Sequence, residues 1–180
     1  PKSGGNAWRG ILRRVSSQSS NDPNINQSKP FKWISHNPAD YERYYELRNQ
    51  RSKRPWTHLI EVLEILDTIP DDRLEAELNP RFAIDNMLWM IALENVFMDN
   101  DSFLRKGYDY FIYEDPQTDR LHLIQHDGNE AFGTGRVGQW PDKDLTRFDP
   151  FFQADNPYFQ LVHRVLNIPR LRERYLAHVR

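Results

Sequence analysis

The stretch RFAIDNMLWMIALENVF, residues 81–97, is apolar on most of its sides when it is wound as a helix. An α-helix with so wide an apolar surface is typical of a protein interior. Asn79 and Pro80 stand directly before it, and they are the residue types that favour a helix N-cap and first turn. We therefore predict that residues 81–97 form a central buried helix that Asn79 caps.

Two short runs with β-type residues follow this helix. They are YDYFIY, residues 108–113, and LHLIQH, residues 121–126, and the turn-rich EDPQTDR lies between them. Runs of this kind on either side of a turn are typical of an antiparallel hairpin. We therefore expect a helix followed by a hairpin at the centre of the fold.

The flanking sequence predicts further helices and some weaker strands. An amphipathic pattern begins at Trp56 and ends before Pro70, which indicates a helix. Asn156 and Pro169 each open a shorter helical pattern. The candidate strands are AWRGILRRV, residues 7–15, and YERYYELR, residues 41–48.

The composition is that of a folded, soluble protein. The chain has 180 residues, of which 38% are hydrophobic and 28% charged, and it contains no cysteine. Disulfides, cysteine-ligated zinc, iron–sulfur clusters and thiol catalysis are therefore excluded. The longest apolar run, residues 87–93, is too short to span a bilayer, and no signal peptide is visible. Because the first residue is Pro1, we expect a fragment or a processed product.

Acidic residues concentrate in the middle of the chain. Residues 55–135 carry 5 Lys or Arg against 17 Asp or Glu. Several of these acids stand at segment ends, and a helix followed by a hairpin would bring such ends together. Carboxylate and amide oxygens are ligands for Mg²⁺, Mn²⁺ or Ca²⁺. Two interpretations stay open, an oxygen-ligand metal site and solvated turn acids, and both concern Asp99, Asp101, Asp109, Asp127 and Asn129.

Other motifs point to no chemistry. The string FGTGRVG, residues 132–138, has the glycine spacing of a dinucleotide site, but no helical pattern follows it. No G-x-S-x-G elbow of a serine hydrolase is present. His122 and His126 would lie about 13 Å apart along a strand, too far to share a metal ion.

The central tract resembles the spore-coat CotH kinase family. The residues that carry the resemblance are MDND, residues 98–101, and YDYFIYEDPQTDRLHLIQHDGNEAFG, residues 108–133. Family members have N-W-D, then a hairpin similar to NYYLY-x-DP-x-TG, then P-W-D-x-D and F-G. The resemblance extends over residues 44–180 through YYELR with WTHLIEVLEIL, and through the closing PRLRERYLAHVR.

This resemblance implies a diverged protein-kinase-like fold of the α+β class, mostly helical. Residues 51–180 would form the helical C-lobe, with the central helix and the hairpin that carries the metal-site acids. Residues 1–50 would be a remnant of the N-terminal lobe and a flexible linker. The implied activity is transfer of the ATP γ-phosphate to a serine of a protein substrate, with Mg²⁺ or Mn²⁺ (or Ca²⁺) as the metal. The implied location is the spore coat or the cell surface, and the sequence leaves the compartment open.

Carried over by position, the resemblance assigns roles to four residues. Asp101 would be the catalytic aspartate, Asp127 the metal aspartate, Asp109 a residue near the family's metal-ligating Asn, and Asn129 a second metal ligand. Asp109 and Asn129 depart from the family's residue types. The residues that would bind the nucleotide itself stay unknown, because the family's lysine and glycine-containing loop belong to an N-terminal lobe.

Two alternatives to an active kinase remain open at this point. One is a pseudokinase or interaction domain, which the departures at Asp109 and Asn129 favour. The other is a structural Ca²⁺-binding module of a surface or coat protein. Because only a remnant of the N-terminal lobe is expected, this chain alone should show little phosphoryl transfer. We expect no nucleic-acid partner and no membrane span, and the sequence leaves the oligomeric state open.

Overall fold

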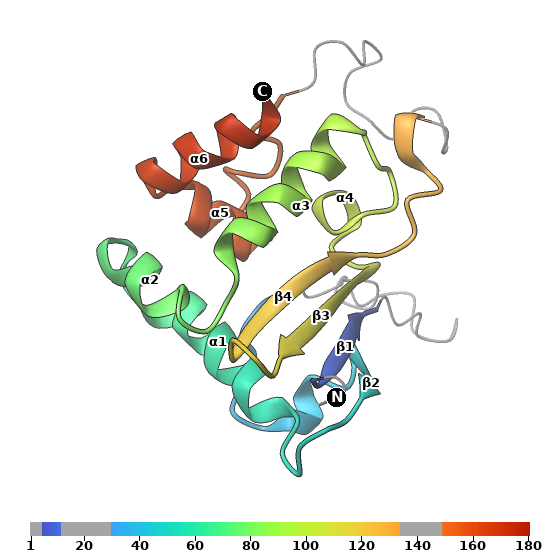
Figure 1. Cartoon of the computed structure of the whole chain (residues 1–180), viewed down its shortest axis with the longest axis vertical. Helices are drawn as coiled ribbons and strands as arrows, with labels where there is room; N and C mark the ends of the chain where they lie inside the picture. Colours follow the sequence, from blue (N-terminus) through green and yellow to red (C-terminus); the bar gives the residue numbers. More distant parts are fainter. Residues whose placement is uncertain (1–4, 12–29, 134–148) are drawn as a thin grey trace, which may run out of the picture.

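A four-stranded antiparallel sheet and six α-helices make up the described part of this computed structural model, residues 5–11, 30–133 and 149–180. The fold is therefore α+β. The helices lie to one side of the sheet, with α3 next to it (Figure 1). The strands follow the order β2-β1-β3-β4, and they are β1 (Ala7–Gly10), β2 (Tyr45–Asn49), β3 (Tyr110–Asp115) and β4 (Arg120–Gln125).

The predicted hairpin is confirmed. Strands β3 and β4 pair antiparallel, from Tyr110 opposite Gln125 at one end to Asp115 opposite Arg120 at the other. The hairpin therefore has two distinct ends. We call the end near Tyr110 and Gln125 the open end, and the end that residues 116–119 close the turn end.

Strand β1 lies inside the sheet, between β2 and β3. Its Trp8 is fully buried and packs against Trp56 with ring centroids 6.1 Å apart. Of the candidate strand 7–15, residues 7–10 form β1, and residues 12–15 lie outside the described residues. Strands from both sides of residue 50 thus share one sheet, and the proposed division there stays a prediction.

The predicted start of the central helix is wrong. Helix α3 is Ile84–Val96, and Asn79 instead ends helix α2 (Asp71–Leu78), where its N–H bonds the Glu75 carbonyl at 3.0 Å. The reason lies in the sheet. The backbone of residues 81–83 runs beside β4: Leu121 donates to the Arg81 carbonyl at 2.8 Å and accepts from the Ala83 N–H at 2.9 Å. Backbone groups used in this way cannot close a helical turn.

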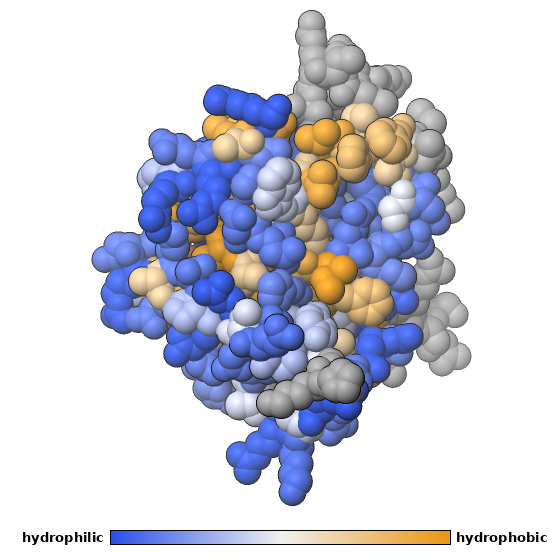
Figure 2. Space-filling model, viewed as in Figure 1, coloured by the Kyte–Doolittle hydropathy of each residue, from blue (hydrophilic) through white to orange (hydrophobic). Residues whose placement is uncertain are grey.

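One side of α3 is less buried than the sequence suggests. Met87, Leu88 and Ile91 are at most 1% exposed, whereas a second row of large apolar side chains reaches the surface. Figure 2 shows apolar side chains gathered at the top of the view, over the C-terminal end of α3. The exposed apolar side chains of this region are Trp89, Leu93, Val96, Phe97 and Phe132.

The remaining helices support α3 and the sheet. Helix α1 (Trp56–Thr68) confirms the predicted amphipathic helix, and α6 (Pro169–Val179) confirms the helix that opens at Pro169. Helix α5 (Gln160–Leu166) starts four residues after Asn156, because Asn156 forms a turn in which its Oδ1 accepts from the Tyr158 N–H at 3.0 Å. No helix in the described residues is long and apolar enough to cross a bilayer.

Candidate metal and catalytic site

Asp99 organises the loop that follows α3. It is 1% exposed, and its Oδ1 accepts from the Asp101 N–H at 3.1 Å. Its carbonyl accepts from the Ser102 hydroxyl at 3.0 Å, and Ser102 in turn caps the short helix α4 (Phe103–Lys106). Burial raises the pKa of the Asp99 carboxyl. The loop that carries Asp101 is therefore fixed at both of its ends.

Glu94 supports this loop from the last turn of α3. Its carboxyl is buried, and Oε2 accepts from the Leu104 N–H at 2.9 Å, at the start of α4. Its Oε1 is buried and has no hydrogen-bond partner among the described residues. Burial raises the pKa of Glu94 to about 8. The sequence analysis missed this residue, although an acid among the apolar residues near the end of this helix is visible in the sequence.

The segment after β4 meets this loop, as the sequence predicts. The Gln125 side chain donates to Asp99 Oδ2 at 2.6 Å, and the Asn100 N–H donates to the Glu130 carbonyl at 3.4 Å. A Cβ on Gly128 would lie 4.0 Å from Asp99 Oδ2, so the backbone of residue 128 passes beside that carboxylate. The end of α3 and the end of β4 therefore lie together at the open end of the hairpin.

Asp101 pairs with Lys106. The Lys106 Nζ lies 2.6 Å from Asp101 Oδ1 and 3.9 Å from Glu130 Oε2, and about a quarter of both the Lys106 and the Asp101 side chain is exposed. Burial works against the charge of Lys106, but the hydrogen bond to Asp101 and the negative charges nearby together outweigh it and raise the pKa of the ammonium. Lys106 thus links acids from the two segments that meet at the open end.

Asp109 is bound to β1 and not to the loop that carries Asp101. Its Oδ1 lies 2.8 Å from the Arg9 guanidinium, and its N–H donates to the Gly10 carbonyl at 3.3 Å, so it is tied to β1. Its φ of 57° is left-handed, a conformation that Asp tolerates better than most residues do. The structure therefore places Asp109 against a cation, and shows no direct contact between it and Asp101 or Asp127.

Asp127 and Asn129 are exposed beyond the end of β4. Asp127 has a φ of 63°, and its carboxylate forms no hydrogen bond or ion pair with a described residue. Gly135 and Gly138 of the FGTGRVG string lie outside the described residues. The carboxylate of Asp127 and the amide of Asn129 are thus two exposed oxygen donors, two residues apart, which suits a hard cation such as Mg²⁺.

A second group of metal-ligand types lies at the turn end of the hairpin. His58 from α1, Glu114 from β3 and Asp119 from the turn each offer a ligand atom, and these atoms all lie within 4.8 Å of one another. Among the described residues, the acids of the open end do not form such a group. The sequence analysis missed this cluster, because His58 and Glu114 are 56 positions apart and no spacing rule connects them.

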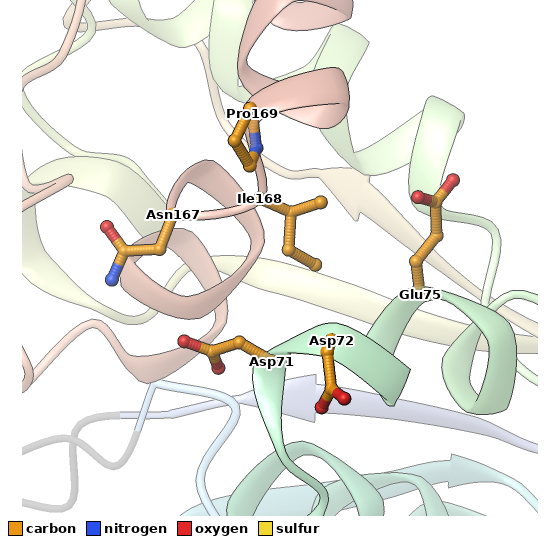
Figure 3. Close-up of a pocket in the computed structure, with 6 residues that line it drawn as sticks. All are labelled: Asp71, Asp72, Glu75, Asn167, Ile168 and Pro169. Carbon is orange, nitrogen blue, oxygen red and sulfur yellow. The ribbon is translucent and has the colours of Figure 1, made fainter.

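An open hollow of about 230 Å³ lies between α2 and the junction of α5 with α6 (Figure 3). Two of its acids are already paired: Asp71 lies 2.6 Å from the Arg164 guanidinium, and Glu75 pairs with Arg170. Arg164 also donates to the carbonyls that end α1. These contacts join helices to one another, and we assign no ligand to the hollow.

Comparisons with known proteins agree with the resemblance. The family described as CotH kinase protein matches residues 7–180, so the match includes β1 as well as the helices and the hairpin. No curated protein matches the chain. A match of this extent includes both segments of the open end. The chain therefore belongs to the CotH kinase family.

Proposed function

We propose that this chain is the kinase-like part of an enzyme that transfers the γ-phosphate of ATP to a serine of a protein. The observation that carries the proposal is the meeting of two acid-bearing segments at the open end. Gln125 bonds Asp99 at 2.6 Å, and Lys106 lies between Asp101 and Glu130. Phosphoryl transfer needs one carboxylate to orient the attacking hydroxyl and others to hold a divalent metal.

In this proposal Asp101 orients the serine hydroxyl. Its backbone N–H is bound to Asp99, and its carboxylate is partly exposed beside Lys106, so it is accessible and fixed in direction. Asp127 is the principal metal ligand, with Asn129 as a second oxygen donor and Asp109 nearby in the family pattern. Mg²⁺ or Mn²⁺ would neutralise phosphate charge there. The residues that bind ATP itself remain unassigned.

One observation favours a pseudokinase or interaction domain as a second candidate. The Asp109 carboxylate is paired with Arg9 at 2.8 Å, and only 17% of its side chain is exposed. A guanidinium in this place supplies the positive charge that a metal would otherwise bring. A domain of this kind would keep the fold and bind its partners without transferring phosphate.

Two measurements on the full-length natural polypeptide test the proposal. The first is metal-dependent thermal shift with Mg²⁺, Mn²⁺ or Ca²⁺, with and without ATP. The second is transfer of labelled phosphate from ATP to serine. We expect Asp127→Asn to abolish the metal shift. Asp101→Asn should keep the shift and lose at least about a hundredfold of the transfer rate.

The control variant is Asp72→Asn, which changes an exposed acid on α2 far along the chain from the proposed site. It should leave both measurements unchanged. A metal and ATP shift without serine phosphorylation would support the pseudokinase. A shift with Ca²⁺ alone, independent of ATP, would support the structural module. Equal behaviour of Asp127→Asn and wild type in all metals would show that the site assignment is wrong.

A further inference from the structure

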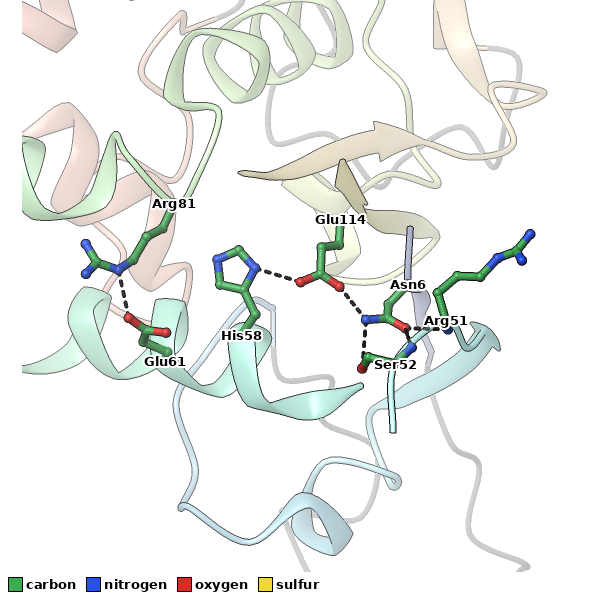
Figure 4. A network of polar contacts seen from close by, with 7 residues as sticks. All are labelled: Asn6, Arg51, Ser52, His58, Glu61, Arg81 and Glu114. Atoms are coloured by element: carbon green, nitrogen blue, oxygen red, sulfur yellow. Dashed lines mark hydrogen bonds and ion pairs between the residues drawn. The ribbon is translucent and has the colours of Figure 1, made fainter. Parts of the chain in front are cut away.

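The cluster at the turn end of the hairpin combines one imidazole with two carboxylates. His58 lies on α1, Glu114 near the end of β3, and Asp119 in the turn between β3 and β4. The three ligand atoms lie within 4.8 Å of one another. Figure 4 shows the His58 ring and the Glu114 carboxylate pointing toward one another across the space between the helix and the strand.

Both carboxylate oxygens of Glu114 are held by hydrogen bonds, one with His58 and one with Asn6. One oxygen lies 2.9 Å from His58 Nδ1, and the other accepts from the Asn6 side-chain amide. Asn6 is 4% exposed, and its Oδ1 accepts from the N–H groups of Arg51 and Ser52 at 2.7 and 3.2 Å (Figure 4). Metal ligands are typically oriented by an outer layer of hydrogen bonds of this kind.

The side chains of His58 and Glu114 are 15% and 16% exposed, so both groups are largely fixed by packing. A carboxylate and an imidazole held side by side in this way form a set of donors that suits a metal ion of the zinc class.

Asp119 completes the group from the solvent side. It is exposed and has a φ of 55°, and its N–H donates to the Asp115 carbonyl at 2.9 Å. Its carboxylate forms no hydrogen bond or ion pair with a described residue. The turn therefore holds a carboxylate over the His58–Glu114 pair without a partner of its own in the described structure.

We propose that His58, Glu114 and Asp119 bind a divalent transition metal of the zinc class, which fastens the hairpin turn to α1. Imidazole with carboxylates suits Zn²⁺ and Co²⁺, whereas Mg²⁺ prefers a set made of oxygen alone. Three protein ligands leave at least one position for water. This cation would be distinct from the one proposed at the open end, and its binding does not depend on kinase activity.

The test is a calorimetric titration of the purified polypeptide with Zn²⁺, repeated with Co²⁺ while the visible spectrum of the bound ion is recorded. Wild type should bind one ion at this site, and Zn²⁺ should raise the melting temperature by about 5 °C. Asp119→Asn should weaken binding at least about tenfold. Asn is suited to this substitution because it tolerates the left-handed backbone, so the turn is kept.

His58→Gln should weaken binding to a similar degree, and His36→Gln is its matched control. His36 lies 3.4 Å from Glu64, so it is also a histidine–glutamate pair, but no third acid joins it in the described structure. Asp127→Asn and an excess of Mg²⁺ should leave Zn²⁺ binding unchanged.

Any of three results would overturn the proposal. The first is no Zn²⁺ or Co²⁺ binding by wild type. The second is equal affinity in Asp119→Asn, His58→Gln and wild type. The third is loss of binding in Asp127→Asn with retention in His58→Gln, which would move the ion to the open end.

Discussion

The two ends of the β3–β4 hairpin differ in how their polar groups are assembled. At the open end, Asp99, Gln125 and Glu130 come from segments close in sequence. Two cations lie beside acids there: Lys106 beside Asp101 and Glu130, and Arg9 beside Asp109. At the turn end, His58 of α1 contacts Glu114 of the hairpin, 56 positions further along the chain. Asn6, directly before β1, donates a hydrogen bond to the same Glu114. One hairpin can thus carry a candidate site whose segments are close in sequence at one end, and a candidate site that only the tertiary fold brings together at the other.

Replacing Trp8 should destabilise both ends of the hairpin at once, and it should lower the free energy of unfolding more than the other substitutions do. Trp8→Ala removes a fully buried ring from β1, the strand that carries Arg9 and directly follows Asn6. The expected loss is about 3–5 kcal/mol in the free energy of unfolding, measured by urea denaturation. The control is Trp89→Ala, whose side chain is 45% exposed and which should cost about 1 kcal/mol. Similar losses in both variants would contradict a central role for β1.

Glu94→Gln should act on the open end alone, and its effect should depend on pH. Burial raises the pKa of Glu94 from 4.5 to about 8, so the folded protein holds this proton where the unfolded chain releases it. The contribution of Glu94 to the stability of the wild type should therefore be greatest below pH 4.5, fall as the pH rises to about 8, and then level off. The variant keeps an acceptor for Leu104 without the charge.

The measurement for this prediction is urea denaturation of wild type and Glu94→Gln across this pH range. The two should be equally stable near pH 4, and the variant should be more stable above pH 8, by about 2 kcal/mol or more. Asp72→Asn, an exposed change, should follow the wild-type curve. A constant difference between Glu94→Gln and wild type at all pH values would contradict the buried-acid interpretation.

Glu114→Gln should weaken the turn end alone. The pH dependence of its effect on stability should be opposite to that of Glu94→Gln. The hydrogen bond with His58 lowers the folded pKa of Glu114, so its stabilising effect is present above the unfolded pKa of 4.5 and is lost as the pH falls through the folded value. We expect a cost of about 1 kcal/mol near pH 7, measured by urea denaturation, and almost none near pH 3. A cost that grows on acidification would contradict this assignment.

Arg9→Met should have the smallest effect on stability. It removes a positive charge from the open end and leaves the charges of the turn end unchanged. The Arg9–Asp109 pair is partly exposed, so its loss should cost about 0.5 kcal/mol. Without the guanidinium, Mn²⁺ binding at the open end should tighten about threefold, because Asp109 regains an unpaired charge. Arg48→Met, which breaks an exposed pair with Glu46, is the control and should leave Mn²⁺ binding unchanged.

Much of the fold follows from local pattern, and the exceptions share a cause. The hairpin and the helix at Pro169 were predictable because alternation and helix-start signals act within a few residues. The start of α3 was not, since the backbone of residues 81–83 bonds a strand about 40 residues away, and Asn79 is as good at ending a helix as at starting one.

The same distinction applies to the candidate sites. The meeting of the end of α3 with the end of β4 could be predicted from sequence, because a helix end and a hairpin end are topologically close. The Arg9–Asp109 pair and the His58 cluster could not, because they join residues separated by 100 and 56 positions. Glu94 lies between these cases: its position in an apolar helix was visible, but its bond to Leu104 requires the turn of the loop.

The interior place of β1 has a consequence for the order in which the protein forms during synthesis. Strand β1 leaves the ribosome about a hundred residues before β3, its neighbour in the sheet. Of the described strands of this sheet, β2 alone is available to pair with it until then, and the edge that β3 later occupies and the Trp8 ring remain without their final cover. Long-range pairing of this kind slows folding. The nascent chain therefore passes through a stage in which this strand, with one edge unpaired, is open to chaperones and to wrong pairing.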